Sequence, residues 1–434
     1  MTPVAVPSKY FSKRFVLWTR FPTHLDDSPW GPVMDAVGWY SVTPECVAIH
    51  AARRLAGRAT ATRGSRVCDG GEVPDAAPES GHVILDLFCG CGGDAIAAAR
   101  SDGIHHVIAV ERDPIRLAAA AHNAVVYGVV SRLTFLLGDA VLLLCKALAA
   151  AKASRELSGL PNPCLFVFIP NPPSESPDPM VAASGDWVER PRICAIEDIA
   201  CAFASLHVPP KPIGGGRWLA ISAVYLAPPW GGVDYRRLGD SRGDAARATS
   251  GESVGFSLSN DVCIESSFAD ELRAFLEVPK PPAFPATAAE SAILPSVASS
   301  TVNGACILSS ALVLSRDIGV FLPRSALRAE VFSEVSSASV IAADFFSRCG
   351  SPSATTALNE SPAPVVSFEE LFLGGAQHPT GIMVYVSGRG QGQAAAVAPT
   401  PCEGVSRAPV EPARMLPVLP VTTCGTSTSS TDRT

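Results

Sequence analysis

The stretch that begins at His82 most constrains the fold, because strand-like and helix-like segments alternate along it at short spacing. A short buried strand is expected at VILDLF, a glycine turn at CGCGGD and a helix at AIAAARS. The same alternation continues through HVIAVE, PIRLAAAAHNAVVYG and LTFLLGD. Such spacing is typical of βαβ units. We therefore predict an α/β fold with a doubly wound, mostly parallel sheet, whose later strands include AISAVYL, RDIGVFLP, FEELFL and GIMVYVSG.

The composition predicts one large core domain with long irregular segments. The chain of 434 residues is 47% hydrophobic, which is enough for a sizeable core, but it also contains 38 Pro and 35 Gly. We expect an N-terminal helical extension over residues 1–60 and a core over 82–390. Pro- and Ser-rich insertions are expected at about 146–217 and 236–300, and a disordered tail over 391–434.

Charge and cysteine usage exclude several classes of protein. The formal net charge of −7 argues against a protein that coats nucleic acid, although a local basic patch is compatible with it. The 13 cysteines are scattered without a C-x-x-C pair, so we expect neither a disulfide scaffold nor a metal site. The longest uncharged run, residues 291–315, is too polar for a bilayer span, and we expect no membrane partner.

The glycine turn has the form of a cofactor-binding loop. Asp86, Phe88, Gly90 and Gly92 form the pattern D-x-F-x-G-x-G between a strand and a helix. Glycines there let the backbone turn tightly and approach a ligand, and the helix start offers free N–H groups. These residues are candidate cofactor contacts.

Two further carboxylates end the next two strands. Glu111 ends the second strand, where it suits a carboxylate that accepts hydrogen bonds from both hydroxyls of a ribose. Asp139 ends the third strand, at the same carboxyl edge. Ligands of open α/β sheets bind at this edge, so both residues are candidate cofactor contacts.

The cofactor predicted from these residues is S-adenosylmethionine. The same glycines, with Ala95, also satisfy the dinucleotide pattern G-x-G-x-x-A, so NAD or FAD is an alternative. Asp86, Asp94 and Asp139 would disfavour a pyrophosphate and suit a sulfonium with an amino acid tail. A glycine turn without any ligand is the third interpretation.

A proline-rich loop carries the candidate catalytic residues. Pro228, Pro229 and Trp230 follow the apolar run AISAVYL. Prolines at the end of a strand make a rigid loop, and a tryptophan on it offers a flat face on which a base can stack. The structural alternative is a tryptophan packed in the core at the end of a strand.

The sequence resembles the trimethylguanosine synthase family of RNA cap hypermethylases. The resemblance extends over about half of the chain. The stretches that carry it are KYFSKRFVLWTRF, GWYSVTPECVAIHAA, ILDLFCGCGGDAI, IAVERDPIRLAAAAHNAVVYG, FLLGDAVLL, YLAPPWGGVDY and IGVFLPRSA. It implies a Rossmann-like class I methyltransferase sheet. It also implies methylation of the exocyclic N2 of a 7-methylguanosine cap, which gives 2,2,7-trimethylguanosine on small nuclear, nucleolar or spliced-leader RNAs.

The resemblance also implies roles for particular residues. Asp86, Glu111 and Asp139 would hold S-adenosylmethionine, and Trp230 would stack on 7-methylguanine. An N-terminal basic and aromatic segment would close over the cap. The implied substrate contacts besides Trp230 are Lys9, Tyr10, Arg14 and Asp234. The implied location is the nucleus, in a nucleolus- or Cajal-body-like compartment, with the cytoplasm as a second location.

Departures from the family pattern keep two alternatives open. Ala227 stands where the family has Ser before PPW, and a long stretch precedes that loop. Within this stretch, residues 169–174 form a second proline loop, IPNPPS, which resembles the loop of amino-methylating enzymes but lacks the aromatic residue. The alternatives are an amino-group methyltransferase acting on internal RNA or DNA bases, and a catalytically inactive cap-binding protein.

Overall fold

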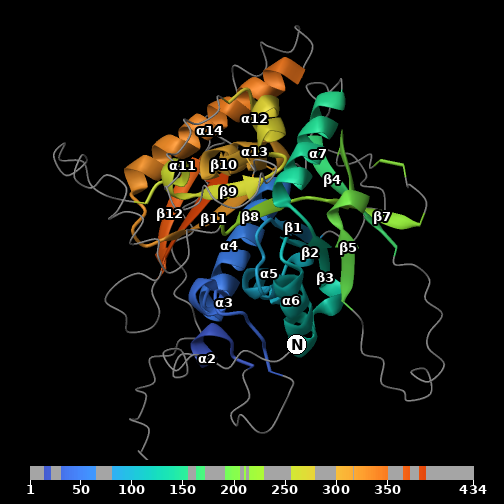
Figure 1. Cartoon of the computed structure of the whole chain (residues 1–434), viewed down its shortest axis with the longest axis vertical. Coiled ribbons are helices and arrows are strands. Elements are labelled where there is room, and N and C mark those ends of the chain that lie inside the picture. Colours follow the sequence, from blue (N-terminus) through green and yellow to red (C-terminus); the bar gives the residue numbers. More distant parts are fainter. Residues whose placement is uncertain are drawn as a thin grey trace, which may run out of the picture. The chain divides into compact units, whose positions relative to one another are not determined.

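The structure is a computed structural model of the whole chain (Figure 1). It describes residues 14–20, 31–64, 81–154, 163–171, 191–205, 210–211, 215–228, 256–278, 300–315, 317–349, 365–371 and 381–387. The predictions for the tail 391–434, and those for Lys9, Tyr10, Pro229, Trp230 and Asp234, lie outside the described residues.

Eight of the described strands form one central sheet, in the order β12-β13-β11-β8-β1-β2-β3-β5 (Figure 1). Their bounds are β1 His82–Asp86, β2 Ile104–Glu111, β3 Leu133–Leu137, β5 Arg192–Ala195, β8 Ala223–Leu226, β11 Asp317–Pro323, β12 Val365–Leu371 and β13 Gly381–Ser387. Neighbouring strands pair in parallel except that β13 is antiparallel to both β11 and β12. This topology confirms the predicted doubly wound, mostly parallel sheet.

The strand order reverses beside β1. The chain passes from β1 to β2 and β3 on one side, and it returns later to β8 on the other side of β1. Ligands of open α/β sheets bind at the carboxyl ends of the strands at such a reversal. The glycine turn follows β1 and the proline-rich loop begins after β8. Both candidate loops therefore begin at the reversal of strand order.

Both faces of the sheet are covered by helices, and side chains alternate between the two faces. Ile84 of β1 packs with α4, α5 and α6, whereas Val83 and Leu85 pack with α7 and α11 to α14. Strands buried on both faces need a continuous apolar sequence, which VILDLF supplies. The helices are α4 Glu45–Gly64, α5 Gly93–Arg100, α6 Pro114–Tyr127, α7 Ala140–Ala153, α11 Leu258–Asp261, α12 Ala269–Leu276, α13 Gly304–Leu314 and α14 Arg328–Cys349, with 3-10 turns η1 Val130–Arg132 and η2 Ile196–Asp198.

Local sequence signals fix the helix that follows β2. The Asp113 carboxylate accepts hydrogen bonds from the backbone N–H groups of Ile115 and Arg116, at 2.8 and 3.4 Å, and Pro114 occupies the first turn. Gly128 ends the helix with φ 67°, a left-handed conformation that favours glycine. Because both ends of α6 are capped, its position after Glu111 is set locally.

The two predicted insertions contain regular structure. The first was expected to begin at about residue 146, but α7 runs to Ala153, because AVLLLCKALAAA is a long apolar helix-forming run. Three later strands form a separate antiparallel sheet, and β5 joins the central sheet beside β3. The second insertion contributes α11, α12 and a two-stranded pair. These additional strands are β4 Pro163–Pro170, β6 Ala200–Ser205, β7 Gly216–Ala220, β9 Cys263–Ser266 and β10 Ser300–Asn303.

The described part of the N-terminal extension packs on the core. It contains α2 Arg14–Leu17, α3 Gly38–Ser41 and α4. Trp18 is 2% exposed and its indole nitrogen donates to Met34 Sδ at 3.1 Å. The guanidinium of Arg20 donates to the carbonyl of Val126 at 2.9 Å and lies over the Tyr127 ring. Arg20 is thus held against the end of α6.

A buried carboxylate fastens this extension to the core. Glu45, 7% exposed, accepts hydrogen bonds from the N–H and hydroxyl of Thr19 and from the Tyr127 hydroxyl, and it pairs with Arg100. Burial raises the pKa of Glu45, but the bonds from Thr19, Tyr127 and Arg100 outweigh it and lower the pKa overall. Further along α4, His50 Nε2 lies 2.8 Å from Glu369 Oε1 on β12.

We expect Glu45→Ala to lower the free energy of unfolding by about 3 kcal/mol, because it leaves Arg100 and Tyr127 without their buried acceptor. Denaturant unfolding monitored by circular dichroism would measure the loss. The exposed Glu271 on α12 provides a control, and Glu271→Ala should change stability by less than about 0.5 kcal/mol. Equal effects of the two substitutions would contradict this account of how the extension is fastened.

Candidate functional site

The glycine turn between β1 and α5 depends on two left-handed glycines. Gly90 has φ 53° and Gly92 has φ 90°. A Cβ on Gly92 would lie 3.1 Å from the side chains of Ala120 and Ile96, so this glycine also permits close packing on α6. A Cβ on Gly90 would meet nothing within 4 Å. The turn is therefore packed on one side and open at Gly90.

Glu111 holds the turn in place from the end of β2. Its Oε2 accepts a hydrogen bond from Gly90 N at 3.0 Å, and its Oε1 accepts one from Asp113 N at 2.9 Å. One carboxylate therefore joins the glycine turn to the start of α6. Each carboxylate oxygen keeps further lone pairs, so Glu111 can still accept hydrogen bonds from a ligand.

Asp139 is held by a residue that sequence reasoning did not identify. Its Oδ1 caps α7 by accepting from Val141 N at 2.9 Å, and its Oδ2 accepts from the Ser266 hydroxyl at 2.5 Å. Ser266 ends β9, within the second predicted insertion, and is buried. A serine in a Ser-rich segment carries no distinguishing local signal, so only the fold could bring it to Asp139.

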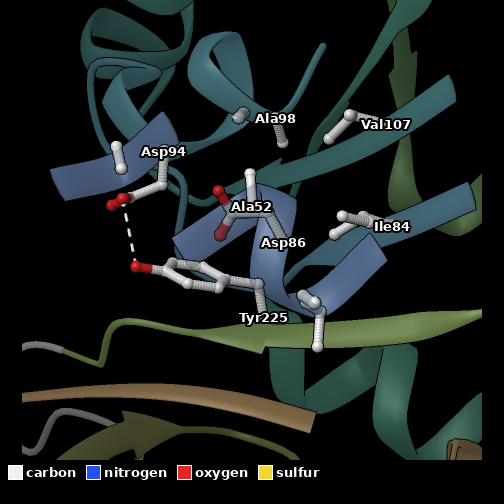
Figure 2. Close-up of a pocket in the computed structure, with 10 residues that line it drawn as sticks. Ala52, Ile84, Asp86, Asp94, Ala98, Val107 and Tyr225 are labelled. Carbon is white, nitrogen blue, oxygen red and sulfur yellow. Dashed lines mark hydrogen bonds between the residues drawn. The ribbon is translucent and has the colours of Figure 1, made fainter. Parts of the chain in front are cut away.

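Asp86 points into the layer beneath α4. Its side chain is 1% exposed. Oδ1 accepts a hydrogen bond from Phe88 N at 3.2 Å, whereas Oδ2 has no hydrogen-bond partner among the described residues. Figure 2 shows its carboxylate beside Asp94, Tyr225 and Ala52. These residues line a cavity of about 10 Å³, close to the smallest space that holds one water.

Asp94 is fixed by two hydroxyls from opposite sides. Thr43 donates to its Oδ2 at 2.9 Å, and Tyr225 of β8 donates to its Oδ1 at 3.0 Å (Figure 2). The Asp94 carboxylate therefore joins the start of α5 to the N-terminal extension and to β8, the strand before the proline-rich loop. The sequence did not connect Thr43 or Tyr225 with Asp94, because Asp94 lies far from both along the chain.

Burial disfavours the charged forms of these two acids, and neighbouring charges add to the effect at Asp86. Burial raises the pKa of Asp94 to about 6, although the hydrogen bonds from Thr43 and Tyr225 oppose the shift. Burial, followed by the charges of Asp94 and Glu111, raises the pKa of Asp86 well above its ordinary range, and the bond from Phe88 N opposes this. Both acids therefore hold a proton more tightly than exposed carboxylates do, and a cation bound beside them would favour their charged forms.

The structure distinguishes the two proline loops. β8 pairs with β1 in the central sheet, so Ala227 and Pro228 leave at its carboxyl end, beside the glycine turn. The loop of residues 169–174 instead begins in β4, which belongs to the separate three-stranded sheet, and Asn171 N donates to Gly215 O at 2.7 Å. This second loop therefore does not start from the central sheet.

The remaining predicted contacts are placed in part. Arg14 lies on α2 with its guanidinium 4.3 Å from the centroid of the Phe15 ring.

Among the described residues, no group of three or more His, Cys, Asp or Glu side chains could hold a metal ion. Within the same ranges, no helix is long and apolar enough to cross a membrane.

The reversal of strand order, the glycine turn and the carboxylates at the strand ends define a Rossmann-like, cofactor-binding α/β protein. Comparison with known families is more specific. Residues 81–171 match the family described as RNA cap guanine-N2 methyltransferase, and this match confirms the resemblance found in the sequence. The matched segment includes β1, the glycine turn, Glu111 and Asp139.

A curated relative and solved structures are also similar to the chain. Trimethylguanosine synthase of Schizosaccharomyces pombe is 38% identical over 150 residues, which cover 34% of this chain and 50% of the relative. The chain thus spans about half the length of that relative. An O-methyltransferase from Bacillus cereus in complex with SAH is 10% identical, covering 78% of this chain and 90% of its own, with TM-score 0.24. Precorrin 8W decarboxylase from Methanobacterium thermoautotrophicum is 11% identical, covering 73% and 91%, also with TM-score 0.24.

We expect Asp94→Asn to change how stability depends on pH. The folded-state pKa of about 6 lies above the ordinary value of 3.8, so the folded protein keeps a proton that the unfolded chain releases. Stability should therefore fall as pH rises from about 4 to about 6, by about 1–3 kcal/mol, and Asn should remove that part of the fall. Chemical unfolding at several pH values would test this, and parallel curves for the two proteins would contradict it.

We expect Glu111→Ala to weaken binding of S-adenosylmethionine by about 100-fold, since charge-assisted hydrogen bonds to a ligand would be lost. Isothermal titration calorimetry would measure the affinity, and thermal unfolding would verify that the variant is folded. Glu197→Ala, at an exposed position, is the matched control and should bind as the parent does. Unchanged affinity in a folded Glu111→Ala protein would show that this carboxylate does not contact the cofactor.

Proposed function

We propose that this chain is an S-adenosylmethionine-dependent methyltransferase that methylates the exocyclic N2 of a 7-methylguanosine RNA cap. The observation that carries the proposal is the match of residues 81–171 to the cap guanine-N2 methyltransferase family. The fold adds support, because it brings the glycine turn and Glu111 of that segment to the reversal of strand order.

The acidic side chains around the glycine turn favour a cationic cofactor. Asp86 and Asp94 lie directly behind the glycine turn, and Glu111 contacts its backbone. The sulfonium and ammonium of S-adenosylmethionine would stabilise the ionised forms of these acids, whereas a pyrophosphate would oppose their ionisation. The acids that the sequence placed around the turn therefore support this cofactor over NAD or FAD.

The residues present fit the cofactor. The open backbone at Gly90 leaves room for a ligand beside the turn, and Glu111 has free lone pairs to accept ribose hydroxyls. Asp139, oriented by Ser266 and Val141, offers a second fixed acceptor at the neighbouring strand end. When bound, S-adenosylmethionine supplies an electrophilic methyl group.

The chain's own residues would orient the acceptor. The loop after β8 begins beside the glycine turn with Ala227 and Pro228, whose carbonyls can accept hydrogen bonds from an exocyclic amine. Trp230, two residues further along, supplies the flat face on which a cationic 7-methylguanine would stack. Fixing the amine toward the methyl donor lowers the entropic part of the barrier. The positive charge of a 7-methylated ring makes the amine more acidic, so its proton can pass to water without a strong general base.

The substrate and location follow from the same proposal. The product would be a 2,2,7-trimethylguanosine cap on small nuclear, nucleolar or spliced-leader-type RNAs, made in the nucleus. Lys9, Tyr10, Arg14 and Asp234 would contact the capped end. A capped RNA is the partner that the family match supports; methylation of internal bases is not favoured by it.

One assay separates these functions. Radiolabelled S-adenosylmethionine is incubated with the full chain and, in parallel, with 7-methyl-GTP, GTP or an uncapped RNA. Label on 7-methyl-GTP alone is the expected result. Label on the uncapped RNA would indicate a base methyltransferase, and cap binding without label would indicate an inactive cap-binding protein.

We expect Trp230→Ala to weaken methylation of 7-methyl-GTP by about 5- to 150-fold or more while leaving S-adenosylmethionine affinity nearly unchanged. Stacking on an aromatic side chain contributes about 1–3 kcal/mol per base, and the cationic ring adds to it. Trp230→Phe, the matched variant, should keep part of the activity. If Trp230 is instead a core residue, Trp230→Ala would cost about 3–5 kcal/mol of stability and both ligands would be lost with the fold.

A further inference from the structure

A second group of polar residues lies at the opposite end of the central strands from the glycine turn. His106 is near the start of β2, whereas Glu111 ends it. Glu111 is five positions further along the strand, or about 17 Å at about 3.3 Å per residue. Arg192 is the first residue of β5, the strand at the edge of the sheet next to β3.

Two guanidinium groups converge there from different elements. Arg217 of β7 places Nη2 3.4 Å from both ring nitrogens of His106. His106 Nε2 lies 2.9 Å from Thr134 Oγ1, and Thr134 is the register partner of Arg192 on β5. Register partners in a parallel pair point to the same face, so Arg192 lies on the face of the central sheet that carries Thr134. Arg217 approaches this face from β7 of the separate sheet, through its contact with His106.

These cations have no anionic partner within the described chain. Neither Arg192 nor Arg217 forms an ion pair with a described carboxylate, and Arg192 Nη1 is buried without a described hydrogen-bond acceptor. Burial, and then the charges of Arg217, His105, Arg192 and Arg132, lower the pKa of His106 to about 3. His106 is therefore neutral at physiological pH and supports the guanidiniums without adding charge.

The donor set fits a phosphate group. Guanidinium groups bind phosphate oxygens through paired N–H donors, and Arg217 is exposed while Arg192 is partly exposed, so a phosphate can approach both. The whole chain has a net charge of −7, so two arginines without a described acidic partner form a local basic site that suits a polyanionic partner.

We propose that Arg192 and Arg217 bind the phosphodiester backbone of the RNA that follows the cap. The identity of the polyanion as RNA rests on the proposed function. The separation along β2 means that the pair would hold nucleotides some distance downstream of the cap, rather than the cap itself. Both arginines belong to the first predicted insertion, which thus acquires a role in substrate binding.

Fluorescence anisotropy with a short labelled, uncapped RNA tests this on the full chain. We expect the double variant Arg192→Gln with Arg217→Gln to bind RNA about tenfold more weakly, and the slope of log K against log salt to fall by about 1–2. Methylation of 7-methyl-GTP should not change, because the pair lies away from the cap site. Thermal unfolding verifies that the variant is folded.

A matched control removes the same charge elsewhere: Arg53→Gln with Lys152→Gln, both at exposed positions. An equal loss of RNA affinity in the control, or an unchanged salt slope in the test variant, would overturn the proposal. Binding to phosphatidylserine vesicles that is lost in the test variant while RNA binding persists would overturn it in favour of a membrane. Because anisotropy requires no methyl transfer, failure of the cap assay with RNA binding retained would refute the proposed function alone.

Discussion

The hydrogen bonds accepted by Glu111 determine the arrangement of the candidate cofactor site. Its two oxygens bind Gly90 N and Asp113 N, so the glycine turn after β1 and the start of α6 after β2 are fixed to one side chain. A left-handed turn has few internal contacts, and Gly90 faces open space. Without an acceptor at this strand end the turn would be free to move, and the ligand-facing N–H groups would lose their common orientation.

A second set of carboxylates connects this turn to the parts of the chain that surround it. Asp94, at the start of α5, is held by Thr43 from the N-terminal extension and by Tyr225 from β8. Asp86, beside them, is buried with one oxygen unpartnered among the described residues. Burying such acids costs stability, and the raised pKa of each reflects that cost. A cationic methyl donor bound next to the turn would stabilise the charged forms of both acids and so offset part of that cost.

The insertions are structural components of the domain. Ser266 of the second insertion orients Asp139, and β5 of the first extends the central sheet beyond β3. The same first insertion brings Arg217 to His106, at the amino end of the sheet. The extension is equally integrated, because Glu45 receives bonds from Thr19 and Tyr127 in a buried position. The matched family segment, residues 81–171, therefore depends on contacts from segments outside it.

The sequence by itself determined the βαβ order, the glycine turn and the strand-end acids Glu111 and Asp139, because continuous apolar runs, glycines and helix caps act over a few residues. It favoured the proline loop that carries Trp230, but it could not show from which sheet either proline loop starts. β4 and β8 both read as apolar strands before prolines, and only sheet pairing put β8 beside β1. The sequence also could not predict the contacts of three further residues, because the partner of each is more than a hundred residues away in the chain. These residues are Tyr225, Ser266 and Arg217. Long-range pairing depends on the packing of the whole domain, which local patterns do not encode.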